Sequence, residues 1–188
     1  MMKLKILLTT ILLVAINSLT AQHHHDKEPV KQKKEVNNKA MKLEIPGSLK
    51  LEHKELHQTL EKFTKLPGKT GLAAQEVATL LHPHFLKEEE YALPPLGLLP
   101  ALARGEANAD MKPVIEMSDK LKNEFQQMLS EHQQIVIEVQ KLKDAAEAEH
   151  HPDVIRFTES LKLHAKTEEE VLYPTAILIG EYLKLKLK

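Results

Sequence analysis

The sequence contains no cysteine and no tryptophan, and it is poor in glycine and in aromatic residues. Without cysteine the protein can form neither disulfide bonds nor thiolate metal sites, so its hydrophobic core must hold the fold unaided. Aromatic residues make up 4% of the chain, while leucine, lysine, glutamate and alanine are abundant. These absences argue against a disulfide-stapled or sheet-based protein and favour helices.

The chain also lacks a hydrophobic run long enough to span a membrane, which needs about 20 residues. The segment 1–21 carries Lys3 and Lys5, an apolar run over residues 6–16, and a small residue, Ala21, at its end. This pattern is typical of a signal peptide, so we expect residues 1–21 to direct export and the mature protein to be periplasmic or secreted. The alternative is an uncleaved anchor, because Leu19 is unfavourable three residues before the cut.

Residues 22–47 are polar and rich in lysine, and we interpret them as a disordered tether. Cleavage after Ala21 would leave Gln22, His23 and His24 at a free amine, an arrangement that suits weak binding of copper(II) or nickel(II). The alternative is a solvated tail. Removing residues 1–21 changes the net charge from -1 to -3, because two lysines and no acids are lost. This balance does not suggest a nucleic-acid partner.

Residues 48–188 suit a single helical domain. Apolar residues spaced three and four apart predict helices over residues 48–65, 72–93, 113–148 and 152–173, followed by a short C-terminal helix within residues 174–187. Pro94, Pro95, Pro100 and Gly105 predict a long crossover. Four such amphipathic helices pack as a bundle, in which cofactor sites are built from inward side chains.

His164 and Glu168 lie four residues apart on the apolar stripe of the last long helix, where they could share one metal ion. Burying a lone carboxylate costs several kcal/mol or more, so Glu168 implies a cation, a proton or an ion pair beside it. The same pair occurs a second time, earlier in the chain, as His84 and Glu88. Each pair is followed by two more glutamates and then by a proline.

Two further dipeptides repeat with nearly the same offset, Glu52-His53 and Glu131-His132. The chain therefore reads as two copies of a two-helix unit. A single histidine in an apolar stripe, such as His132, is by itself usually a core residue with a satisfied partner. Here each of the four helices offers a histidine at comparable depth, at positions where packing alone would select leucine.

His57 lies four residues after His53 and beside the same stripe, so both imidazoles are expected to point inward. The alternative is that His57 packs beside the bundle and binds nothing. His82 lies on the opposite side of its helix from His84, and we expect it at the surface.

Taken together, these motifs resemble the hemerythrin-like, or HHE cation-binding, family over residues 49–173. The resemblance implies an all-α fold, an antiparallel up-down four-helix bundle, that holds a non-haem di-iron centre with an oxo or hydroxo bridge. The implied carboxylate bridges are Glu88 and Glu168. The implied terminal ligands are His53, His57, His84, His132 and His164. In similar proteins the one remaining position binds dioxygen. Imidazole with carboxylate also suits iron on chemical grounds.

The sequence departs from the oxygen-carrying members of that family at two places. Val136 stands where they have a second histidine on the third helix, and both repeats have glutamate four residues after the histidine where they tend to have aspartate at five. We therefore expect an exported di-iron protein that binds or senses oxygen or nitric oxide, rather than a reversible carrier. The alternatives are a di-iron oxidoreductase acting on these molecules and a metal-free structural bundle. The sequence favours binding over turnover, because it shows no reductase or electron partner.

Overall fold

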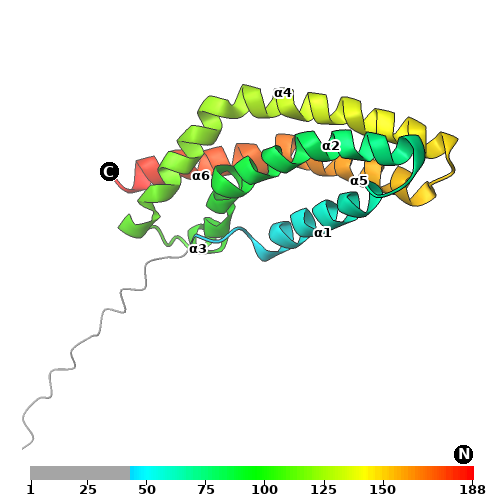
Figure 1. The fold of residues 1–188 in the computed structure, drawn as a ribbon. Helices are drawn as coiled ribbons and strands as arrows, with labels where there is room; N and C mark the ends of the chain where they lie inside the picture. Colours follow the sequence, from blue (N-terminus) through cyan, green and yellow to red (C-terminus); the bar gives the residue numbers. More distant parts are fainter. Residues whose placement is uncertain (1–42) are drawn as a thin grey trace, which may run out of the picture. The chain divides into compact units, whose positions relative to one another are not determined.

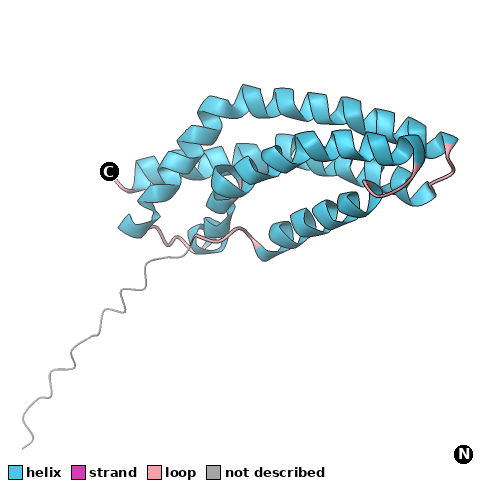
Figure 2. Cartoon of the chain, viewed as in Figure 1, coloured by secondary structure: helices cyan, strands magenta, loops and turns pink. Residues whose placement is uncertain are grey.

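The computed structural model describes residues 43–188, and every regular element within them is a helix (Figures 1 and 2). The predicted signal peptide and most of the predicted tether lie outside the described residues. Four long helices appear where the apolar period predicts them, which confirms the all-α expectation. Their bounds are α1 Gly47–Phe63, α2 Gly68–Lys87, α4 Lys112–Ala148 and α5 Pro152–Thr167.

Two of these helices continue through a π-helical turn. α2 passes into η1, Glu88–Ala92, and α5 passes into η4, Glu168–Leu172. α6, Tyr173–Lys186, follows η4 without a break, so the predicted C-terminal helix extends the same rod. Pro174 stands in the first turn of α6, where a missing backbone N–H is tolerated.

The predicted crossover after η1 contains three short helices, η2 Pro94–Leu98, α3 Leu99–Ala103 and η3 Ala109–Met111. Leu96 and Leu98 are buried there, so the crossover closes one end of the bundle. Leu43 and Ile45, ahead of α1, pack against the same core. Gly97 permits this approach, because a Cβ at that position would collide with the backbone of Glu44.

α4 lies along α2, α5 and α6, while α1 lies against α2 and α5 (Figure 1). With 37 residues, α4 is about 55 Å long and contributes to the core over that whole length. α6 comes close to α4 at Gly180, where a Cβ would collide with the side chain of Ser118. No helix in residues 43–188 is both long and apolar enough to cross a membrane.

The apolar interior consists of two separate clusters. One contains Leu60, Val77, Val139 and Leu161 among others, toward the turn between α1 and α2. The other contains Leu93, Leu121, Met128 and Ile179 among others, around the crossover and α6. Along α4, His132 falls between the two sets of apolar residues. The buried histidines and glutamates thus form a polar layer between two apolar cores.

Candidate metal centre

The two histidine–glutamate pairs occupy equivalent positions in their helices. His84 and His164 lie in the last turns of α2 and α5, and Glu88 and Glu168 are the first residues of the π turns. The amide of Leu93 donates to the Glu88 carbonyl over 2.9 Å, an i to i+5 bond that defines such a turn. π turns of this kind are frequent at functional sites.

The structure brings six of the seven predicted ligands together. Their donor atoms form two groups, each within 4.8 Å, that have Glu168 in common. The groups are His84, Glu88, His132 and Glu168, and His53, His164 and Glu168. Glu88 also faces the second group, because its Oε2 is 3.7 Å from His53 Nε2. Both carboxylates therefore lie between the two groups of histidines.

Burial makes this cluster costly without a cation. Each of the six side chains is at most 5% exposed. Three of their polar atoms, Glu88 Oε2, His164 Nε2 and His53 Nδ1, make no well-aligned hydrogen bond although they are buried, and the first two face the cluster. Unsatisfied buried polar atoms are rare in native interiors. Atoms of this kind, aimed into a cluster of imidazoles and carboxylates, fit a metal site.

The two buried carboxylates have opposite pKa shifts. Burial raises the pKa of Glu88, and the nearby Glu168 carboxylate raises it further. Burial acts in the same direction on Glu168, but hydrogen bonds from His132 and other histidines outweigh it, so the pKa of Glu168 lies well below its usual value. A cation between the two carboxylates would offset the repulsion from Glu168 that raises the pKa of Glu88.

The histidines show the complementary effect. Burial lowers the pKa of His84 and of His164, but the neighbouring glutamates more than offset this, and both pKa values are raised. The pKa of His164 is raised to about 9. The metal-free protein thus holds protons where a cation would lie, and metal binding must displace them.

Each of the four clustered histidines has a second carboxylate at its outer nitrogen. The distances from Nδ1 to the nearest carboxylate oxygen are 2.9 Å for His84 and Glu131, 2.9 Å for His132 and Glu169, 3.2 Å for His164 and Glu52, and 3.5 Å for His53 and Glu89. A carboxylate at Nδ1 holds the proton there and leaves the Nε2 lone pair for a metal. This outer ring of carboxylates is typical of histidine metal sites.

Sequence reasoning did not assign a role to these four outer glutamates, although their signal was present. Glu52 and Glu131 are the first residues of the repeated Glu-His dipeptides, and Glu89 and Glu169 are the second members of the glutamate runs. Each contacts a histidine on another helix, so helix periodicity could not pair them. The third members of the runs, Glu90 and Glu170, face outward instead and pair with lysines.

Tyr173 is a second residue that sequence reasoning missed. Its hydroxyl donates to Glu88 Oε1 and lies 3.4 Å from His84 Nε2 and 3.3 Å from His132 Nε2. In a regular α-helix, Tyr173 would be rotated about 140° from Glu168, away from the site. The wider π turn of η4 brings it back toward the interior.

The repeat makes the two halves of the cluster chemically unequal. Leu93 is the counterpart of Tyr173 in the first repeat and is fully buried in the apolar core. Phe85 stacks on the ring of His53 with centroids 4.2 Å apart, whereas its counterpart in the second repeat is Ala165. One group of donors therefore has a phenol beside it, and the other has an apolar ring.

The seventh predicted ligand, His57, does not join the cluster. The structure differs here from the expectation that His57 points inward beside His53: its side chain is exposed, and its ring centroid is 5.6 Å from that of His82. A residue four positions further along an α-helix is rotated by about 40°, and on α1 this turns His57 outward, toward α2. His82 is exposed, as the sequence predicts.

The donor set of this site is four imidazoles and two carboxylates, without sulfur. Such a set suits iron and related divalent metals, and helical bundles hold dinuclear centres with similar side chains. A family model, the hemerythrin HHE cation binding domain, matches residues 44–176, which include all six clustered residues. Searches of curated proteins and of solved structures find no match. Because the family match covers more than half of the chain and includes the whole buried cluster, this protein belongs to the hemerythrin HHE cation-binding domain family.

Proposed function

We propose that the chain is an exported non-haem di-iron protein that binds or senses a small diatomic ligand, oxygen or nitric oxide. The observation that carries the proposal is the pair of buried donor groups that have Glu168 in common, with Glu88 facing both. Two carboxylates between two sets of imidazoles are suited to bridge two ions. In this proposal the helices alternate in direction, as an antiparallel up-down bundle.

The six side chains leave room for small ligands. Each ion would take two imidazole nitrogens and one oxygen from each carboxylate, with an oxo or hydroxo bridge as a fifth donor. Each of the two six-coordinate ions would then have one open position. The seven-ligand set implied by the resemblance leaves only one open position in the whole dinuclear centre. Iron in this setting would supply reversible redox change and open positions for oxygen or nitric oxide.

Tyr173 favours a second candidate, an oxidoreductase acting on the same molecules. Its hydroxyl lies within 3.4 Å of two histidine nitrogens of one donor group and donates to Glu88. Reduction of oxygen or nitric oxide requires protons, and a buried phenol can deliver one at the site. A metal-free structural bundle is disfavoured, because Glu88 and Glu168 would stay buried without a cation.

Export rests on the sequence of segment 1–21, which lies outside the described part of the chain. The charged start, the short apolar run and Ala21 support a cleaved signal peptide. Mass spectrometry of the protein from its native host tests this proposal. A mature chain that begins at Gln22 in the exported fraction supports it, and an intact Met1 in the cytoplasmic fraction contradicts it.

Metal analysis combined with optical spectroscopy tests the centre. The purified protein should contain about two iron ions per chain, as six donors arranged in two groups imply. Its spectrum in the reduced form should change on exposure to oxygen or to nitric oxide. Steady consumption of either gas with a reductant present would instead support the oxidoreductase.

Substitution of Glu88 and Glu168 tests whether these two carboxylates bridge the metal ions. Glu88→Ala and Glu168→Ala should each abolish the dinuclear form, because each removes a proposed bridge. Glu90→Ala is the control, since Glu90 belongs to the same glutamate run but is exposed and pairs with Lys120. Full iron occupancy in either bridge variant would contradict the proposed centre.

A further inference from the structure

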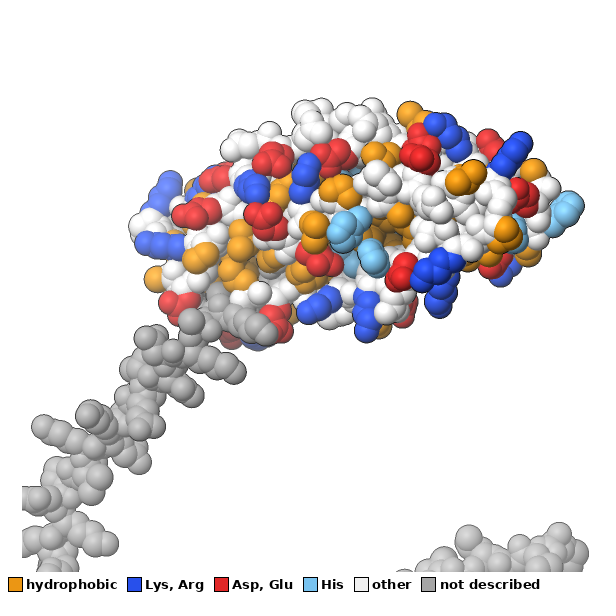
Figure 3. Space-filling view, viewed as in Figure 1, with side chains coloured by type: hydrophobic (Ala, Val, Ile, Leu, Met, Phe, Trp, Pro, Cys, Tyr) orange, Lys and Arg blue, Asp and Glu red, His pale blue; other side chains and the backbone are white. Residues whose placement is uncertain are grey.

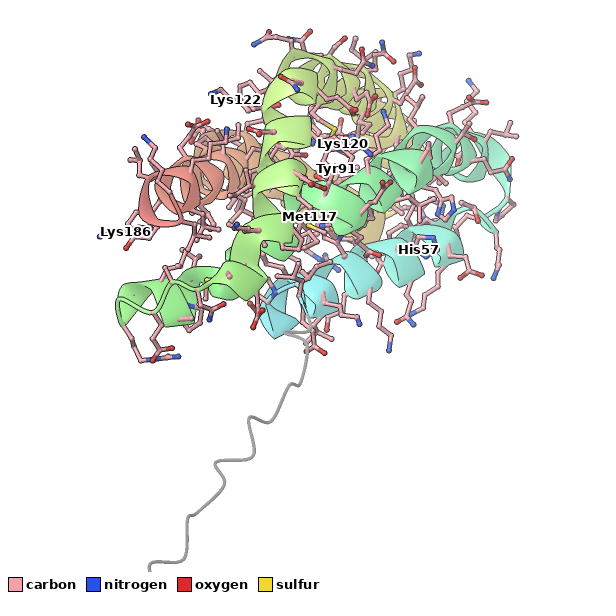
Figure 4. All side chains as sticks on the ribbon, turned by 90° about the vertical axis from the view of Figure 1, so that its left-hand side faces the viewer. His57, Tyr91, Met117, Lys120, Lys122 and Lys186 are labelled. Carbon is pink, nitrogen blue, oxygen red and sulfur yellow. The ribbon has the colours of Figure 1, made fainter. Side chains whose placement is uncertain are left out.

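His57 and His82 form an exposed pair that the metal centre does not use. They come from neighbouring helices, α1 and α2, and their rings lie 5.6 Å apart at an angle of 57°. Figure 4 shows His57 on α1 at the side toward α2. Figure 3 shows exposed histidine side chains together on this face of the bundle, beside apolar atoms. Two imidazoles from adjacent helices can bind one divalent ion after small rotamer changes.

Glu61 is a carboxylate that lines the same hollow as the two histidines. It lies four residues after His57, one turn further along the same face of α1. With both histidines it lines a hollow of about 180 Å³. Glu61 pairs with Lys65 over 2.9 Å, but both side chains are exposed and such a surface pair is weak. The carboxylate is therefore available to a cation. Two imidazoles and one carboxylate suit ferrous iron and similar divalent metals.

A larger groove connects this pair to the buried centre. Its volume is about 450 Å³, and its lining includes His57, His82 and Glu61 at one end. The same groove is also lined by His53, Phe85 and Glu89, and by Lys50 and Lys54, whose charges balance those of the two glutamates. His53 belongs to the candidate metal centre, and Glu89 lies 3.5 Å from His53 Nδ1. The exposed histidine pair and one histidine of the centre therefore line the same groove.

We propose that His57 and His82, assisted by Glu61, form a capture site for a divalent metal ion at the mouth of the groove that leads to His53. The inference rests on the dinuclear centre proposed above, which the captured ion would fill. The site has at most three protein donors and is open to solvent, so binding there is weak and transient. Glu89 provides a second carboxylate in the groove, beside His53, and the ring of Phe85 stacks on His53.

The experiment measures how fast iron enters the metal-free protein. Full-length protein with the three tail histidines at 23–25 changed to alanine is the background, because the tail could also bind metal. Ferrous iron is added without oxygen, and a colorimetric chelator samples the iron that is not yet in the centre. His57→Ala and His82→Ala should each slow loading, because each removes one of the two imidazoles that hold the ion at the surface. The final iron content and spectrum should match the parent.

His151→Ala is the control for these variants, since His151 lies in the connection between α4 and α5 and does not line the groove. It should load at the parent rate. Parent-like loading in both His57→Ala and His82→Ala would overturn the proposal. A reduced final iron content in His57→Ala would also overturn it, because His57 would then be a ligand of the centre itself.

Cobalt(II) gives a second readout that does not depend on the centre. Protein whose centre is already loaded should bind one further cobalt ion, with paramagnetic shifts of the His57 and His82 imidazole signals in NMR spectra. If the parent takes up no iron at all, the proposed function fails, and the same titration of the iron-free protein still decides the capture site. Shifts that disappear in His57→Ala support it, and unshifted imidazole signals overturn it.

Discussion

The hydroxyl of Tyr173 donates a hydrogen bond to Glu88 in the interior of the bundle. At the residue scale this contact competes with metal, because the same carboxylate is a proposed bridge. In the metal-free protein the phenol satisfies one oxygen of Glu88, while the other has no partner. In the metal-loaded protein, cations would interact with both oxygens of Glu88.

Tyr173→Phe should therefore destabilise the metal-free protein more than the loaded protein. Removing the donor from a buried carboxyl costs about 1–3 kcal/mol, and a bound cation would replace much of that loss. Thermal or urea unfolding of both forms measures the difference. Tyr91→Phe is the matched control, since its hydroxyl donates to Glu124 over 2.7 Å and not to a residue of the cluster. An equal loss in both forms for Tyr173→Phe would contradict the prediction.

Glu169 tests the outer ring of carboxylates, because its side chain contacts His132 Nδ1 at 2.9 Å. Glu169→Ala should lower metal affinity about 10- to 100-fold, as loss of such outer contacts typically does. Titration against a competing chelator measures the change. Glu170→Ala, one residue further and exposed, should leave the affinity unchanged. Equal affinities of the two variants would mean that the outer carboxylate does not orient His132.

At the scale of helices, Glu149 links the end of α4 to the start of α2. Its carboxylate accepts hydrogen bonds from the amides of Lys69, at 2.7 Å, and Thr70, at 3.0 Å. The preceding Gly68 has a positive φ of 79°, and a Cβ there would collide with this carboxylate. A carboxylate at a helix N-terminus satisfies free amides and interacts favourably with the helix dipole.

The Glu149 contact should give stability that depends on pH. Its hydrogen bonds to the backbone amide of Lys69 and to Thr70 lower the pKa of Glu149 to about 2, from its ordinary value of 4.5. Because the folded pKa is the lower one, this stabilisation is present above pH 4.5 and is lost as the pH falls from 4.5 toward 2.

Glu149→Gln keeps an oxygen acceptor but removes the charge, so metal-free parent and variant should differ most at neutral pH. The difference in unfolding free energy should shrink below pH 4.5 and nearly vanish near pH 2. Urea unfolding at several pH values measures it. Glu147→Gln, a nearby exposed position on α4, is the control. A difference that stays constant with pH would show that the charge does not contribute.

At the scale of the whole bundle, the polar layer interrupts what would otherwise be one continuous core. Removing metal with a chelator should lower the midpoint of thermal unfolding, because an ion bound only by the folded protein stabilises it. At a hundredfold excess over the dissociation constant, one ion contributes about 2.7 kcal/mol, or about 5–10 °C for a chain of this size. Calorimetry with and without chelator measures the shift. Glu88→Ala should show no chelator effect, and an unchanged midpoint in the parent would contradict the prediction.

The helices could be predicted because the spacing of apolar residues that marks a helix is a local property of the sequence. Leu56, Leu60 and Phe63 are spaced three and four apart and are buried on α1 as that spacing requires. The same rule placed His53, His84, His132 and His164 on the inward faces of four helices. It could not foresee that η4 joins α5 to α6, since a π turn depends on how the surrounding helices pack and not only on the residues within it.

His57 and Tyr173 show where a regular helical period misleads. His57 has the spacing of an inward residue, yet its side chain is exposed. Its exposure depends on how α2 packs against α1, which the α1 sequence alone does not specify. Tyr173 is out of phase with Glu168 and is nevertheless buried beside His84 and His132. Both outcomes depend on a few tens of degrees of helix rotation, which only packing against other helices determines.

The sequence by itself determined the chemistry of this protein: that histidines and glutamates lie on the apolar stripes of the helices, that thiolate ligands are absent, and that the donors come in two repeated sets. Periodicity and composition are properties of neighbouring residues, so they can be read without a fold. Only the tertiary structure decided which donors meet, that Glu168 belongs to both groups, and that Glu52, Glu89, Glu131 and Glu169 lie next to the outer nitrogens. Each of these contacts joins residues on different helices, and their distances follow from the packing of the whole bundle.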